Sequence, residues 1–161
     1  MTDDAVATEH ELLDELNRVF PDACFTDTEM LDKKYSDCAT YNLFCQTNKA
    51  QPFCVVRPGW DYNEQLVRLV ELTRKFNKKI VILGGGSGVC GAFKVRGGEI
   101  IVDMTSLNKI VLIKKPTVEE EGLALVEAGV FGDKLDEFLK PKDLPMAIIR
   151  PRWQYLLSAA G

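Results

Sequence analysis

The chain of 161 residues is long enough for one domain with a sizeable core, and its 46% hydrophobic and 27% charged residues are ordinary for a globular protein. Its formal net charge of −4 disfavours nucleic acid as a partner. No apolar run is long enough to span a bilayer, and Asp3 and Asp4 stand where a secretory signal would be basic, so we expect a cytoplasmic protein.

The charge is unevenly distributed along the chain. Residues 1–32 contain ten acidic residues and one basic residue, a net charge of −9 that leaves +5 for the remainder. We interpret the first part as an acidic solvated helix. The mildly basic remainder suits an anionic ligand such as a phosphate.

The cysteines and the histidine do not form a recognisable metal-binding pattern. The five cysteines are an odd number without a Cys-x-x-Cys pair, and the single histidine, His10, lies in the acidic segment. We therefore expect reduced structural thiols and no metal. The cysteines are Cys24, Cys38, Cys45, Cys54 and Cys90.

Helical and extended patterns alternate along the chain. Capping-box spacings followed by apolar residues at helical intervals predict helices over residues 8–20 and 61–77. A third helical pattern covers residues 131–140. Apolar runs bounded by glycine, proline or charge predict strands over residues 54–56, 80–83, 99–103, 110–113 and 123–127. This alternation indicates an α/β or α+β class.

The most informative segment is a glycine loop, residues 84–91, directly after the run 80–83. That run is continuously apolar, which predicts a strand buried on both faces. Glycine lets backbone N–H groups turn into one concavity and lets a ligand approach closely. Ser87 adds a hydroxyl donor. The loop therefore predicts a phosphate site, because a flexible connector rarely begins inside a buried strand.

Two other phosphate motifs fit less well. Residues 86–91 match Gly-x-Gly-x-x-Gly, and Asp103 supplies a later acid, but this fingerprint must open a crossover helix. Residues 92–96 instead run directly into Gly97-Gly98, a predicted turn. A nicotinamide-binding Rossmann fold is therefore disfavoured. A P-loop is disfavoured as well, because the Gly-Lys-Ser/Thr sequence is absent.

Five segments occur in an order and spacing that resembles one family of flavoproteins. They are residues 53–58, 63–76, 79–91, 100–110 and 126–135. Over residues 33–140 the chain is similar to FAD-dependent oxidases and dehydrogenases of the p-cresol methylhydroxylase and vanillyl-alcohol oxidase type. The nearest patterns are those of D-lactate dehydrogenases, the glycolate oxidase flavoprotein subunit and alkyldihydroxyacetonephosphate synthases. The resemblance implies an α+β fold, the first subdomain of an FAD-binding domain, with short strands flanked by helices.

The resemblance also implies FAD as the cofactor and assigns roles to matching positions. These positions are Pro58, Gly84, Gly85, Gly86, Ser87, Gly88, Gly91, Asp103, Met104, Ala128, Gly129 and Val130. Relatives with covalent flavin often have a histidine in the glycine loop; here there is none, so we expect non-covalent FAD, with Cys90 as an apolar filler. For Asp103, a turn-capping carboxylate is an equal alternative. We interpret Val56, Ile101 and Val126 as core.

We divide the chain into three parts. Residues 1–50 form the acidic helix and lead-in, residues 51–140 the first, pyrophosphate-binding half of an FAD-binding domain, and residues 141–161 a tail. The family's second half and substrate domain do not follow, so no residue is assigned a catalytic role. We expect the complete protein to oxidise a small hydroxy acid. The alternatives are an alkyldihydroxyacetonephosphate synthase-like flavoenzyme and a non-catalytic truncated remnant.

The tail departs from the family pattern. It lacks the expected Ser-Thr and Gly-Gly pairs, yet residues 158–161 resemble the end of that motif. Codons for residues 146–154, read in a shifted frame, can encode Gly-His-Tyr-Pro-Pro-Ser, which resembles ether-lipid-synthase-like relatives. We therefore expect a truncated or frameshifted tail. The alternative is a genuine short segment that packs Trp153 onto the core.

Overall fold

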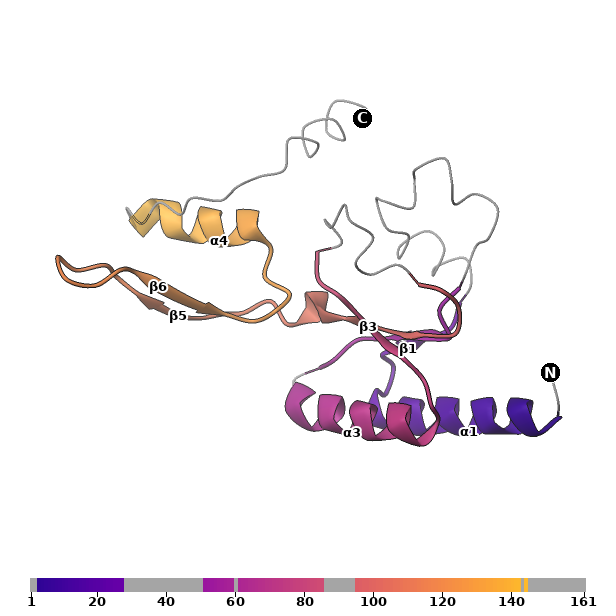
Figure 1. Ribbon diagram of the computed structural model, residues 1–161. Coiled ribbons are helices and arrows are strands. Elements are labelled where there is room, and N and C mark those ends of the chain that lie inside the picture. The colour runs from indigo at the N-terminus through magenta and orange to yellow at the C-terminus, as the bar shows by residue number, and fades with distance from the viewer. Residues whose placement is uncertain (1–2, 28–50, 60, 86–94, 143, 145–161) are drawn as a thin grey trace, which may run out of the picture. The chain divides into compact units, whose positions relative to one another are not determined.

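The computed structural model describes residues 3–27, 51–59, 61–85, 95–142 and 144 (Figure 1). The chain forms two compact units, and each is described by itself. The first unit contains residues 1–108 and 127–129, and the second contains residues 109–126 and 130–161. The predictions made for the tail beyond Leu144 lie outside the described residues.

The first unit is built on a four-stranded sheet with the order β1-β2-β4-β3. Its strands are β1 (Cys24–Phe25), β2 (Cys54–Val56), β3 (Ile80–Leu83) and β4 (Ile100–Asp103). Strand β1 is antiparallel to β2, whereas β2 and β3 both pair with β4 in parallel. The carboxyl ends of the three parallel strands therefore meet at one edge of the sheet.

Two helices, α1 (Asp3–Val19) and α3 (Tyr62–Lys75), lie side by side against one face of this sheet (Figure 1). Alternate residues of each strand point to this face, which explains why the apolar runs pack onto the helices. The buried cluster consists of Leu12, Leu16, Phe20, Cys54, Val56, Leu69, Leu72, Ile100 and Val102. Residues Val55, Leu83 and Ile101 form a smaller cluster on the opposite face.

The sequence-based strands 54–56 and 80–83 are confirmed, but three details differ. Helix α1 begins at Asp3, so the capping-box start at Thr8 is wrong. Asp61 precedes α3 but makes no side-chain capping hydrogen bond. Strand β3 is not buried on both faces, because it lies at the edge of the described sheet and Ile82 is 58% exposed. Strand β4, which has a neighbour on each side, is buried at all four residues.

The second unit contains an antiparallel pair, β5 (Ile110–Lys114) and β6 (Leu123–Val126), and the helix α4 (Gly132–Leu139). These elements agree with the predicted strands and helix to within one or two residues. Leu135 and Leu139 are the buried residues of α4. Among the described helices of both units, none combines the length and the apolar character needed to cross a membrane.

The packing of α1 predicts a large loss of stability on truncation of Phe20, which is fully buried in the helix-covered cluster. We expect Phe20→Ala to lower the free energy of unfolding by about 3–5 kcal/mol, through lost transfer energy and a residual cavity. The control is Val67→Ala on α3, where the side chain is 63% exposed, with an expected change within about 0.5 kcal/mol. Urea unfolding followed by circular dichroism measures both; similar losses would contradict this core.

Candidate functional site

The carboxyl edge of the parallel strands collects several of the residues singled out in the sequence. Arg57 and Pro58 follow β2, Gly84 and Gly85 follow β3, and Met104 follows β4. In open sheets of this kind, ligands bind in the crevice outside the carboxyl ends of the strands. The edge formed by β2, β3 and β4 is therefore the candidate site.

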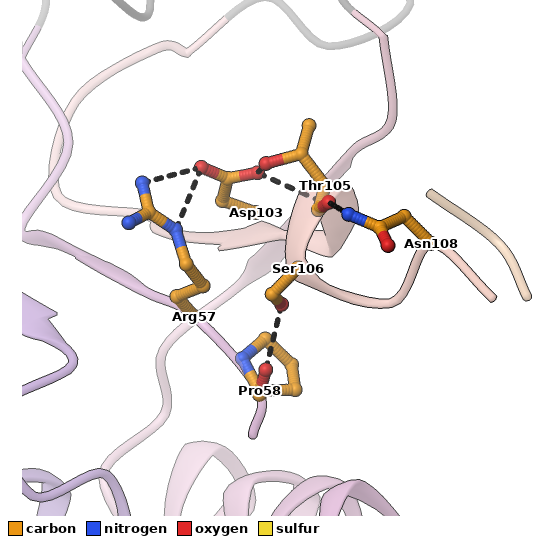
Figure 2. Close-up of polar contacts among 6 residues, drawn as sticks. All are labelled: Arg57, Pro58, Asp103, Thr105, Ser106 and Asn108. Atoms are coloured by element: carbon orange, nitrogen blue, oxygen red, sulfur yellow. Dashed lines mark hydrogen bonds and ion pairs between the residues drawn. The ribbon is translucent and has the colours of Figure 1, made fainter. Parts of the chain in front are cut away.

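Asp103, the last residue of β4, is the electrostatic centre of this edge (Figure 2). Arg57 donates to its Oδ2 atom from Nη2 at 3.0 Å and from Nε at 3.3 Å. The backbone N–H and the hydroxyl of Thr105 donate to Oδ1 at 3.0 Å and 2.5 Å. The side chain of Asp103 is only 1% exposed, so these bonds offset the cost of burying its charge.

These contacts bear on the alternatives left open for Asp103. The carboxylate accepts from the backbone of Thr105 and so caps the short 3₁₀ turn η1 (Met104–Ser106). The turn-capping interpretation is confirmed. The side chain also holds Arg57, whose guanidinium lies 5.1 Å from the centre of the Phe25 ring and whose side chain is 29% exposed. Asp103 thus fixes a cation at the edge of the sheet.

The turn η1 is tied to the end of β2 by a second contact (Figure 2). The Ser106 hydroxyl donates to the carbonyl oxygen of Pro58 at 2.6 Å, and Pro58 is buried. Within the turn, Leu107 N donates to Met104 O at 3.0 Å. Pro58 and Met104, both predicted cofactor-binding residues, are thereby held in one local structure.

Gly129 comes from a distant part of the sequence and packs directly on this turn. Its N–H donates to Leu107 O at 2.8 Å. A Cβ atom at this position would lie 1.9 Å from Met104 O and 2.7 Å from Met104 C, so only glycine fits. A Cβ on Gly84 would lie 4.0 Å from Ala128 O. The structure thus brings Ala128 and Gly129 to the same edge as Gly84 and Met104.

For the remaining predicted site residues the structure gives no position at this edge. Gly86, Ser87, Gly88 and Gly91 lie outside the described residues. Val130 belongs to the second unit. Of the residues predicted as core, Val56 and Ile101 are fully buried, whereas Val126 is partly exposed.

The sequence interpretation missed Arg57, the cation nearest to Asp103. A signal was available, because Arg57 directly follows a buried strand and precedes a proline. The described edge combines a cation with a glycine that has space around it. It offers the partly exposed side chain of Arg57 after β2. After β3, an added Cβ on Gly84 would meet, among the described residues outside its chain neighbours, only Ala128 O at 4.0 Å.

Comparisons with known proteins bear on this site. A protein-family model described as an FAD binding domain matches residues 52–148. The alkyldihydroxyacetonephosphate synthase of Dictyostelium discoideum is 31% identical over 94 residues, which are 56% of this chain and 14% of that protein. The D-2-hydroxyglutarate dehydrogenase of Escherichia coli (strain K12) is 33% identical over 109 residues, 66% of this chain and 10% of that protein. The chain therefore spans a small part of the length of these relatives.

Solved structures agree with the fold. A p-cresol methylhydroxylase structure has a TM-score of 0.70 at 19% identity, covering 86% of this chain and 26% of the other. An alkyldihydroxyacetonephosphate synthase structure has a TM-score of 0.66 at 25% identity, covering 83% of this chain and 25% of the other. The predicted α+β fold, with short strands flanked by helices in the p-cresol methylhydroxylase manner, is confirmed.

The close approach at Gly129 predicts a strong and local steric effect. We expect Gly129→Ala to lower the free energy of unfolding by about 2–4 kcal/mol, because the backbone of Met104 must move to admit a methyl group. Gly84→Ala is the matched control, since among the described residues outside its chain neighbours its Cβ would approach no atom closer than 4.0 Å, and its expected change is within about 1 kcal/mol. Urea unfolding of both variants is the measurement. Equal effects would show that Gly129 is not packed as described.

The ion pair of Arg57 and Asp103 predicts non-additive energetics. We expect Asp103→Ala to lower the unfolding free energy by about 2–4 kcal/mol. Arg57 would lose its ion-pair partner, and the Thr105 N–H would lose the carboxylate that caps the turn. The double variant Asp103→Ala, Arg57→Met should lose less unfolding free energy than the sum of the losses of the two single variants. The exposed ion pair Arg68–Glu71 is the control: Glu71→Ala should change the unfolding free energy by about 0.5 kcal/mol or less. Strict additivity in the Arg57–Asp103 cycle would refute the coupling.

Proposed function

Because the chain belongs to the FAD binding domain family, we propose that the carboxyl edge of β2, β3 and β4 holds the diphosphate of FAD in a flavoprotein oxidoreductase. The observation that carries this proposal is the convergence at one edge of the segments that follow β2, β3 and β4 with the segment 127–129. Ligands of this chemistry bind at such edges, where glycine backbone and a cation are available.

The proposed contacts divide between backbone and side chains. The glycine loop, residues 84–91, would supply N–H groups and the Ser87 hydroxyl to the diphosphate oxygens. Pro58, Asp103, Met104 and residues 128–130 would border the cofactor. When bound, FAD supplies a hydride acceptor. The cofactor would be held without a covalent bond, since the glycine loop contains no histidine.

Arg57 would contribute positive potential at this edge. Its guanidinium is held by Asp103 on one side and rests against the Phe25 ring, while 29% of the side chain is exposed. A cation whose position is fixed in advance loses little conformational entropy when an anion arrives. We therefore assign Arg57 a positioning role beside the diphosphate.

The activity of the complete protein is proposed from the relatives. Their names include a dehydrogenase of a 2-hydroxy acid, which supports a small hydroxy acid as the substrate. The comparably similar alkyldihydroxyacetonephosphate synthases support the alternative of an ether-lipid-synthase-like flavoenzyme. In either case residues 51–140 would form the diphosphate-binding half. The proposed location is the cytoplasm.

The cofactor proposal predicts direct binding of FAD and ADP. Isothermal titration of the purified chain should show binding of both, and bound FAD should give a flavin absorption spectrum. Gly86→Val should weaken both affinities by roughly tenfold or more, because a branched side chain fills the phosphate space and resists positive φ. The control is Thr26→Val, which adds the same side chain at an exposed position of the first unit.

Three outcomes distinguish the alternatives. Binding that Gly86→Val leaves unchanged would remove the glycine loop from the site. A colourless chain that binds neither FAD nor ADP would support the non-catalytic remnant. For a longer form of the protein, anaerobic mixing with D-lactate, glycolate, D-2-hydroxyglutarate and acyl-dihydroxyacetone phosphate separates the substrate classes by which compound changes the flavin spectrum.

A further inference from the structure

Cys24 and Cys54 lie on neighbouring strands and on the same face of the sheet. In the antiparallel pair β1–β2, Cys24 is opposite Val56 and Phe25 is opposite Val55. Side chains two residues apart on a strand share a face, so Cys54 is the diagonal neighbour of Cys24. Both belong to the helix-covered side: Cys54 is part of the buried cluster and Cys24 packs against it.

The two thiols interact directly but differ in environment. The Cys54 thiol donates a hydrogen bond to Cys24, and this bond lowers the pKa of Cys24. The same bond and burial raise the pKa of Cys54. Cys24 is half-buried, whereas Cys54 is fully buried. A half-buried cysteine on β1 is therefore backed by a second, enclosed cysteine on β2.

We propose that Cys24 and Cys54 form a dithiol modification site that reacts with low-molecular-weight disulfides and closes to an internal disulfide. The Cys24 thiolate attacks one sulfur of the reagent, forming a mixed disulfide and releasing one reduced thiol. The Cys54 sulfur then attacks the Cys24 sulfur, and the second reagent thiol leaves with the proton of Cys54. Two protein thiols are oxidised and one reagent disulfide is reduced to two thiols.

The bridge would act on the part of the fold that supports Arg57. Strand β1 continues its pairing beyond β2, since Arg57 N donates to Ala23 O at 2.9 Å. The Phe25 ring lies under the Arg57 guanidinium. A bond between Cys24 and Cys54 would fasten β1, and α1 before it, to the strand that ends at Arg57. The oxidised chain would gain stability because the unfolded state is constrained.

The test uses the chain with Cys38→Ser, Cys45→Ser and Cys90→Ser, incubated with oxidised glutathione. Intact-mass analysis should show the loss of two hydrogens, and peptide mapping should join Cys24 to Cys54. The midpoint of thermal unfolding should rise by about 5 °C or more relative to the reduced chain. Stable glutathione addition at Cys24 with Cys54 left as a thiol would overturn the proposal.

Two further variants in the same background separate the roles of the thiols. Cys54→Ser should stop at one glutathione on Cys24, and Cys24→Ser should leave Cys54 unmodified in the folded chain. If the background variant does not fold, the same mapping on the unaltered chain decides. A Cys24–Cys54 bridge supports the proposal, and bridges from either residue to Cys38, Cys45 or Cys90 contradict it. None of these readouts depends on FAD binding.

Discussion

The buried carboxylate of Asp103 is the constraint from which the candidate site is built. It stands at the end of β4, the strand that is buried at all four residues, with its side chain 1% exposed. A charge in such a place must be paired and hydrogen-bonded, and Arg57 and Thr105 provide those bonds. The same carboxylate therefore fixes a cation at the end of β2 and the turn that follows β4.

The turn η1 then determines how the segment 127–129 can pack against it. Because Met104 O and Leu107 O face Gly129, the segment 127–129 fits against the turn only without a side chain at residue 129. Ser106 adds a bond to Pro58 on the other side. The result is an edge whose members hold one another before any ligand binds. Preorganisation of this kind lowers the entropic cost of binding.

The helices and strands could be predicted from the sequence better than the contacts between them. Apolar runs bounded by breakers located β2 and β3, and the motif order identified the family. Strand β1 was missed, because two residues in a mixed segment carry no periodicity. The Arg57–Asp103 pair joins residues 46 apart, which no local pattern reveals. The exposure of Ile82 was misjudged because an apolar run does not show which strand lies at a sheet edge.

The strand order has a consequence for synthesis on the ribosome. Strand β4 is the last of the four in sequence but lies between β2 and β3, which do not pair with each other. Until residue 103 has emerged, both earlier strands lack their parallel partner and their apolar runs have unpaired edges. Non-local parallel pairing is slow, and unpaired edges favour association with other chains. Helices α1 and α3 cover one face of these strands, but only β4 can pair their open edges.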